Sequence, residues 1–228
     1  ITNRCPLTDW LHKAIYCEGA KMREGCVLSV FTDSIFVVLA LYFVLTFARS
    51  LFFVLAEPRF VLIHQFFFLI FQLVALVLFL VRKSAAVFSS KITDYICTLV
   101  ALSTPMFLQP VMSQKVSILG ESLETLGGVI VLSAFLSLNT SFGIAPENRG
   151  IKTSGMYRIV RHPMYLGYIL AEVGFVFNNL SFSNVVILTI AVVFLLLRLQ
   201  AEERLLRQDS IYQSYVRKIP WKLIPFAF

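Results

Sequence analysis

Six long apolar runs constrain this chain more than any other feature of its sequence. They cover residues 27–48, 60–81, 92–112, 116–138, 163–180 and 182–200. A helix that crosses the hydrocarbon core of a bilayer needs about 20 mainly apolar residues. Hydrophobic residues make up 58% of the chain, more than a soluble fold of this size can bury. The pattern therefore predicts an all-α, polytopic integral membrane helical bundle of about six transmembrane helices.

The third and fourth runs are less regular than the others. Pro105 and Pro110 interrupt the third run, and Glu121 and Glu124 lie within the fourth. Glu172 lies in the fifth run. Ionisable groups at such depth are costly and are often functional. We expect structural pairing for Glu121 and Glu124, and the role of Glu172 stays open.

The basic residues predict how the bundle sits in the membrane. Of the 20 Lys and Arg residues, all but Arg49, Arg59 and Lys115 fall on the same side as the N-terminus if the chain crosses six times. Cytoplasmic loops carry the excess of Lys and Arg in membrane proteins. We therefore expect a multi-pass protein with both termini in the cytoplasm. The net charge of +7 follows from this topology, and no nucleic-acid partner is expected.

The segments outside the apolar runs suggest two regions. Residues 1–138 would hold an N-terminal segment and four spans that form a lipid or substrate cavity, with residues 1–26 either an interfacial helix or a disordered lead. Residues 139–228 would hold a cofactor-binding loop, two spans and a charged, amphipathic cytoplasmic helix at 201–219. Cys5, Cys17, Cys26 and Cys97 form no metal-ligand pattern, so we expect free thiols and no metal.

The densest polar stretch, residues 148–168, precedes and enters the fifth run. Pro163 suits the first turn of a helix, which places Arg161 and His162 just before the helix N-terminus. The unpaired N–H groups and the dipole of such an end favour a carboxylate or a phosphate. This turn therefore predicts a site for an anionic group of a cofactor.

Helix geometry links this turn to the end of the sixth run. The helix from Pro163 rises about 1.5 Å per residue, and a return of equal length ends near Gln200. Arg198, Glu202 and Glu203 would then lie beside the turn at the membrane surface. A pocket with a cation, carboxylates, a histidine and tyrosines suits S-adenosylmethionine, whose ammonium and hydroxyl groups need carboxylate acceptors. Methyl transfer requires mainly placement and removal of water.

The combination Arg161-His162-Pro163-Met164-Tyr165-Leu166-Gly167 with Glu202-Glu203 resembles the superfamily of isoprenylcysteine carboxyl methyltransferases and phospholipid methyltransferases. The resemblance covers about residues 141–225. It implies S-adenosylmethionine as the cofactor, S-adenosylhomocysteine as the product, and a membrane lipid or lipidated molecule as the substrate. Met156 departs from the family, because many relatives have Pro at this position.

The resemblance also implies roles for individual residues. Arg198 would face the substrate, and Arg198 and Arg161 are the candidates for catalytic roles. The residues implied to bind the cofactor are Arg149, Gly150, Ile151, Lys152, Tyr157, His162, Pro163, Met164, Tyr165, Glu202 and Glu203.

Several other interpretations remain open at this stage. Arg161 and His162 could only cap a span by reaching to the interface. Glu202 and Glu203 could only pair with Arg198 and Arg207 on a solvated helix. Tyr212 and Tyr215 could be interfacial anchors. The chain could instead be a membrane reductase that uses NADPH, because sterol reductases have a related Arg-His-Pro loop, or a non-catalytic scaffold or transporter. The sequence does not identify the methyl acceptor.

Overall fold

A computed structural model describes residues 85–111 and 117–227, together with isolated positions between 27 and 83. Our predictions for residues 1–26, including Cys5, Cys17 and Cys26, lie outside the described residues. Most of the first two predicted spans also lies outside them. The count of six spans therefore stays a prediction.

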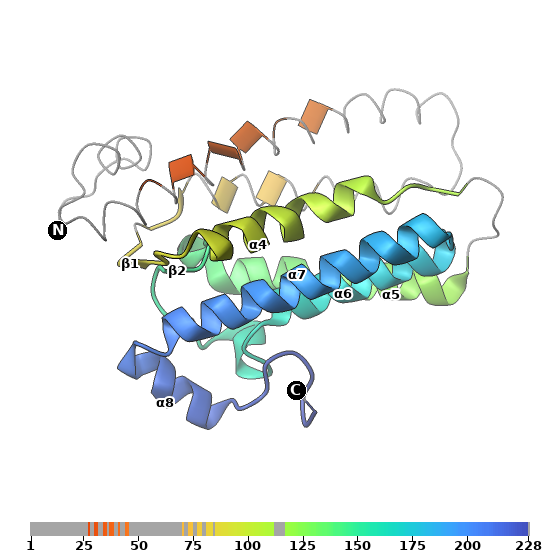
Figure 1. The fold of residues 1–228 in the computed structure, drawn as a ribbon. Coiled ribbons are helices and arrows are strands. Elements are labelled where there is room, and N and C mark those ends of the chain that lie inside the picture. Colours follow the sequence, from red (N-terminus) through yellow and green to blue (C-terminus); the bar gives the residue numbers. More distant parts are fainter. Residues whose placement is uncertain are drawn as a thin grey trace.

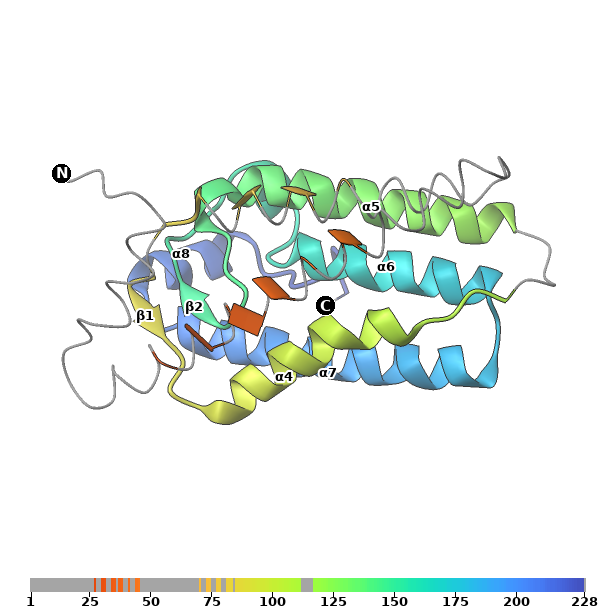
Figure 2. The same cartoon turned by 90° about the horizontal axis from the view of Figure 1, so that it is seen from above.

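The described part of the chain is mainly helical, and its helices lie alongside one another (Figures 1 and 2). They are α4 (Ile92–Ser103), α5 (Ile118–Leu138), α6 (Pro163–Asn178) and α7 (Phe182–Leu206), and the shorter α8 (Ser210–Lys218) lies at one end of this group. Short 3-10 turns occur at Thr104–Phe107, Asn139–Ser141 and Gly155–Arg158. Strands β1 (Val87–Phe88) and β2 (Glu147–Asn148) pair antiparallel at the same end as α8, with Val87 opposite Asn148.

Two of the described helices are long and apolar enough to cross a membrane. They extend over Ile118–Ser141, which is α5 with the 3-10 turn that follows, and over Phe182–Leu206, which is α7. α7 also exposes apolar side chains such as Val186, Val193 and Leu197. Because water disfavours such surfaces and lipid does not, these helices support the predicted membrane bundle.

The third predicted span is shorter than expected. We predicted residues 92–112, but α4 ends at Ser103 and a 3-10 turn continues only to Phe107. Pro105 explains this end, because proline lacks the backbone N–H that would continue the hydrogen bonding of the helix. The expected cytoplasmic helix also differs. α7 runs on to Leu206, and α8 starts after a turn in which the Asp209 side chain accepts a hydrogen bond from the backbone N–H of Ile211 (2.8 Å).

Asparagines fasten the turn between α6 and α7 to the chain that links α4 with α5. The Asn184 side chain accepts from the N–H of Gln109 (3.0 Å), and the Asn179 side chain accepts from the N–H of Val111 (2.9 Å). Asn178 accepts from the N–H of Ser117 (2.9 Å). Buried backbone groups need such partners. These bonds lie at the end of the helices opposite to α8, and they hold α6 and α7 in an antiparallel hairpin (Figure 2).

Glycines allow α5 and α6 to pack closely. A Cβ atom added at Gly127 would lie 2.6 Å from the carbonyl oxygen of Gly167, and one added at Gly167 would lie 2.6 Å from a methyl group of Val131. Small residues let helix backbones approach in this way in membrane proteins. Gly127 and Gly167 therefore allow the backbones of α5 and α6 to approach closely.

We expect Gly167→Leu to destabilise the bundle by about 1–3 kcal/mol, the usual cost of overpacking. The leucine would have to push α5 away from α6, because the added Cβ meets backbone atoms. Thermal unfolding of the detergent-purified protein measures the change. Ser122→Leu is the matched control, because Ser122 is exposed on α5 and an added side chain there displaces nothing buried. Equal melting temperatures for the two variants would contradict the packing argument.

Candidate functional site

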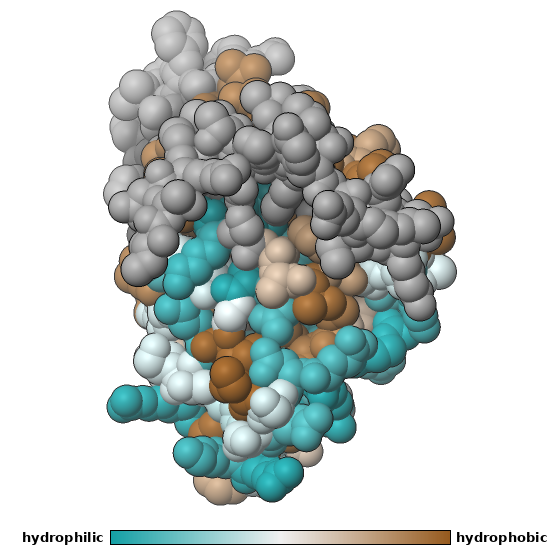
Figure 3. Space-filling view, turned by 90° about the vertical axis from the view of Figure 1, so that its left-hand side faces the viewer, coloured by the Kyte–Doolittle hydropathy of each residue, from teal (hydrophilic) through white to brown (hydrophobic). Residues whose placement is uncertain are grey.

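The polar groups singled out in the sequence gather at the end of the bundle where α6 begins and α7 ends. The loop 142–162, α8 and the C-terminal segment meet there (Figure 1). Figure 3 views the molecule from this end and shows hydrophilic residues over much of the described surface, with hydrophobic ones between them. The predicted meeting of the two distant polar segments is observed.

The turn before α6 is held by the C-terminal segment. His162 is the N-cap residue of α6, and Pro163 occupies the first turn, as predicted. The backbone N–H groups of Arg161 and His162 donate to the carbonyl oxygens of Trp221 and Lys222, both at 2.9 Å. These contacts could not be predicted from the sequence, because backbone pairing does not depend on residue type. The C-terminal segment thus holds the backbone at Arg161 and His162 in place and sets the direction of their side chains.

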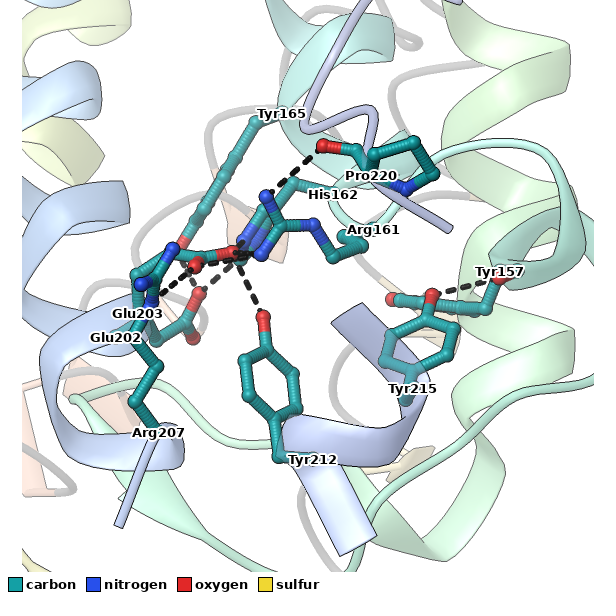
Figure 4. A network of polar contacts seen from close by, with 10 residues as sticks. All are labelled: Tyr157, Arg161, His162, Tyr165, Glu202, Glu203, Arg207, Tyr212, Tyr215 and Pro220. Atoms are coloured by element: carbon teal, nitrogen blue, oxygen red, sulfur yellow. Dashed lines mark hydrogen bonds and ion pairs between the residues drawn. The ribbon is translucent and has the colours of Figure 1, made fainter. Parts of the chain in front are cut away.

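Glu203 is the centre of a buried polar network (Figure 4). Its carboxylate accepts from Nη1 of Arg161 (2.6 Å to each oxygen) and lies 2.9 Å from Nε2 of His162. It also accepts from the hydroxyl of Tyr212 (2.7 Å) and from Nε of Arg207 (3.3 Å). Burial and the charge of Glu203 raise the pKa of Tyr212 above its usual range, so its hydroxyl stays protonated and donates. A buried carboxylate is tolerated when its partners satisfy it in this way.

The neighbouring carboxylate, Glu202, has a different environment. Its Oε2 accepts from the Tyr165 hydroxyl (2.8 Å) and lies 3.6 Å from Nδ1 of His162. Within the described residues, no hydrogen bond reaches its second oxygen, Oε1. The side chain is 19% exposed, against 7% for Glu203. Of the two adjacent carboxylates, Glu202 is therefore the one with capacity for a ligand.

Arg198 lies one helical turn before Glu202. It is 2% exposed, its guanidinium lies 5.2 Å from the centre of the Tyr165 ring, and Nη2 donates to the carbonyl oxygen of Ile144 (2.7 Å). The Tyr165 ring in turn stacks on His162, with ring centres 5.5 Å apart. Among the described residues, Nε of Arg198 has no hydrogen-bond partner. A buried Arg donor without a partner is costly, and Arg149 and Arg161 also have such an Nε among the described residues.

The loop after β2 supplies backbone groups. Arg149 pairs with Glu147 and donates to the carbonyl oxygen of Lys83. Gly150 has φ of +97°, a conformation that glycine adopts easily, and its N–H donates to the Asn148 side chain (2.9 Å). Asn148 also donates to Asp209 (3.0 Å), which ties the loop to the start of α8. These hydrogen bonds hold the backbone of residues 149–152 in one conformation.

Tyr157 and Tyr215 join the second part of the loop to α8. The Tyr215 hydroxyl donates to the carbonyl oxygen of Tyr157 (2.6 Å), and both rings are buried. Burial raises the pKa of each hydroxyl above its usual range, so both stay protonated. Tyr212 and Tyr215 are 3% and 5% exposed. The interpretation of these two residues as interfacial anchors is therefore wrong.

These elements surround a pocket of about 90 Å³. Of the predicted site residues, it is lined by Arg149, Gly150, Ile151, Lys152, Tyr157, Arg161, His162, Met164, Tyr165 and Glu202. Pro163, Arg198 and Glu203 are near but do not line it. The lining residues that sequence reasoning missed as site residues are Leu138, Ser141, Gly143, Glu147, Leu206, Tyr212 and Tyr215. Of these residues, Leu138, Ser141, Gly143 and Leu206 are apolar or small and carry no chemical signal in the sequence.

The structure also tests two predictions about single residues, Arg161 and Glu124. Arg161 is 4% exposed and pairs with Glu203, so it is not an interfacial cap. Glu124 accepts from the Asn178 side chain (3.3 Å), so its predicted structural pairing is confirmed.

Comparison with known families agrees with the motif. Residues 116–214 match the family described as phospholipid methyltransferase. The matched segment contains α5, the loop, α6 and α7, and it ends within α8. The resemblance to this superfamily of membrane methyltransferases is therefore confirmed. No curated protein and no solved structure matches the chain.

Proposed function

We propose a specific reaction for this chain, whose residues 116–214 form a phospholipid methyltransferase domain: transfer of a methyl group from S-adenosylmethionine to an acceptor in the lipid phase. The family assignment gives membrane methyltransferase activity in general. The cofactor, the acceptor and the roles of single residues are the finer part of the proposal, as are the six spans and the cytoplasmic termini.

The observation that carries the proposal is the free capacity of Glu202 inside the pocket. Oε1 of Glu202, which no hydrogen bond from a described residue reaches, can accept from the ammonium or from the ribose hydroxyls of the cofactor. Charge-assisted hydrogen bonds of this kind are among the stronger ones in proteins. Lys152 and the backbone N–H of Ile151 supply donors for the carboxylate of the cofactor. Tyr157 and Met164 supply apolar surface for its base.

The size of the pocket supports an adjustment on binding. Its volume of about 90 Å³ is below the roughly 300 Å³ at which small-molecule sites begin. We propose that Glu202 and Lys152, which are only partly buried, move outward to admit the cofactor. Glu203 and Arg161 stay in place, because the ion pair between them is buried. The buried polar network around Glu203 then forms the part of the site that does not move.

When bound, the cofactor supplies a sulfonium whose methyl group reacts with a nucleophile in line with the carbon–sulfur bond. The protein has to hold both molecules and exclude water. His162 and Tyr165 position Glu202, and the C-terminal segment positions His162. We propose that Arg161 acts through Glu203 as a positioning residue rather than by touching the substrate. Arg198 keeps its proposed place on the substrate side, because it lies one turn deeper in the bundle than Glu202.

Ligand binding tests the proposal against the two alternatives. We expect the purified full chain in lipid nanodiscs to bind S-adenosylhomocysteine and not NADPH, measured by calorimetry. Oε1 of Glu202, which no hydrogen bond from a described residue reaches, favours a ligand with positive charge, which NADPH lacks. Binding of NADPH alone would support the reductase, and binding of neither ligand would support a scaffold or a transporter; either result overturns the proposal.

A further inference from the structure

The chain beyond α8 turns back toward the bundle. α8 ends at Lys218, and Pro220, which cannot continue the hydrogen bonding of a helix, follows soon after. The C-terminus lies beside the bundle, closer to the middle of its long helices than α8 does (Figures 1 and 2). Residues 219–227 therefore run from α8 back along the helices that support the predicted membrane bundle.

Leu223 shows how far this segment returns. It is 5% exposed and belongs to one hydrophobic cluster with Leu195 and Leu199 of α7. Leu199 precedes Leu206, the last residue of α7, by about 10 Å at a rise of about 1.5 Å per residue. Interfacial elements bury their apolar side by about 5–10 Å at the boundary between head groups and acyl chains. The segment thus reaches a level of α7 that suits this boundary.

Hydrogen bonds hold the segment in this position. The carbonyl oxygens of Trp221 and Lys222 accept from the N–H groups of the turn before α6, both at 2.9 Å. The carbonyl oxygen of Pro220 accepts from Nη2 of Arg161 (3.2 Å). The side chains that the segment exposes therefore belong to an ordered surface.

A turn at the end of the segment presents large apolar side chains outward. The N–H of Ala227 donates to the carbonyl oxygen of Ile224 (3.2 Å), which closes the turn. Phe226 has φ of +67°, a left-handed conformation that is costly for a bulky residue. Ile224 is 52% exposed, and Phe226 is 86% exposed. Water disfavours such a surface and lipid does not, so contact with lipid would offset these costs.

Basic residues accompany this apolar surface. From the start of α8 onward, the chain contains Arg217, Lys218 and Lys222 and no Asp or Glu. Arg217 and Lys218 are exposed, and within the part of the chain that the structure describes no carboxylate forms an ion pair with either. The Trp221 ring packs on Phe226, with ring centres 5.3 Å apart, and tryptophan is enriched where membranes meet water. Positive charge beside apolar and aromatic side chains complements a bilayer surface with anionic head groups.

We propose that residues 217–227 form a C-terminal anchor that binds the surface of a bilayer containing anionic lipids. Ile224 and Phe226 enter the boundary of the acyl chains, and Trp221 lies at the level of the head groups. Arg217 and Lys218 contact the anionic head groups. Such lipids concentrate in the cytoplasmic leaflet, the side predicted for this end of the chain. The contact does not depend on the proposed methyl transfer.

The fluorescence of Trp221 tests the anchor. The sequence contains two tryptophans, so Trp10→Phe leaves Trp221 as the single reporter in the full chain. In vesicles of phosphatidylcholine and phosphatidylserine, we expect phosphatidylcholine with brominated acyl chains to quench this reporter. Bromine close to the head group should quench more strongly than bromine near the chain end, because the indole lies at the interface. Acrylamide, a quencher dissolved in water, should quench it only weakly.

Two pairs of variants in this background test the apolar and the basic part. Ile224→Asp places a charge in the acyl boundary, so quenching by brominated lipid should be lost. Ile211→Asp, at an isoleucine of α8 that is 63% exposed, is the matched control and should keep the quenching. Phosphatidylserine should increase the quenching relative to phosphatidylcholine alone, and Lys218→Glu should reduce this gain. Lys91→Glu makes the same charge change at an exposed lysine before α4 and should retain the gain.

Other results would overturn the anchor. Quenching of Trp221 by acrylamide and not by brominated lipid would place the segment in water. Quenching by neither would mean that protein, such as a second copy of this chain, covers the segment. Equal quenching by brominated lipid with and without Ile224→Asp would contradict insertion of the turn. A gain from phosphatidylserine that Lys218→Glu leaves unchanged would contradict recognition of anionic lipids.

Discussion

Replacing Glu203 by alanine is expected to destabilise the protein by about 3–5 kcal/mol, the usual cost of breaking a buried ion pair from one side. The Arg161 guanidinium would remain buried with a positive charge and no carboxylate. His162 and Tyr212 would lose their shared acceptor at the same time. Thermal unfolding in detergent should show a melting temperature lower by about 10 °C or more.

A double substitution separates the charge effect from simple loss of packing. Arg161→Met combined with Glu203→Met removes both charges and fills much of their volume, and such exchanges are often neutral or stabilising. We expect the double variant to be more stable than Glu203→Ala. If the two variants unfold at the same temperature, the ion pair is not what Glu203 contributes. Tyr212→Phe removes only one hydrogen bond and should cost about 1 kcal/mol.

The sequence predicted which segments form the site but not how adjacent residues divide their tasks. Proline at a helix start and the helical rise were enough to bring Arg161 and His162 to Glu202 and Glu203. Both carboxylates were assigned to the cofactor, because adjacent identical residues look alike in a sequence. The angle of about 100° between neighbours on a helix turns one inward to Arg161 and the other toward the pocket. The contact with α8 distinguishes the two carboxylates, because the Tyr212 hydroxyl donates to Glu203.

The parts that could not be predicted depend on backbone contacts between distant segments. The C-terminal segment pairs with Arg161 and His162 through N–H and C=O groups that every non-proline residue has. The lining by Leu138 and Gly143 follows from where α5 ends, not from their chemistry. By contrast, the early end of α4 could have been anticipated from Pro105, because the penalty of proline in a helix is local.

Replacing Glu202 by alanine is expected to act on binding rather than on stability. Two charge-assisted hydrogen bonds of about 1.5 kcal/mol each amount to a loss of about 100-fold in affinity for S-adenosylhomocysteine. The fold should persist, because Glu202 is partly exposed and forms no ion pair with an Arg or Lys among the described residues. Calorimetry measures the dissociation constant, and thermal unfolding of the same sample checks stability.

Glu202→Gln provides the control for charge at constant shape. The amide oxygen can still accept one hydrogen bond, so this variant should bind more weakly than the wild type and more tightly than Glu202→Ala. Unchanged affinity in both variants would remove Glu202 from the cofactor site and leave His162 and Tyr165 without a ligand to position. A large fall in melting temperature for Glu202→Ala would instead place this carboxylate with Glu203 in the structural network. Glu202→Ala and Glu203→Ala alter different faces of α7 at adjacent positions. Comparing them therefore tests whether Glu202 contacts the ligand while Glu203 stabilises the fold.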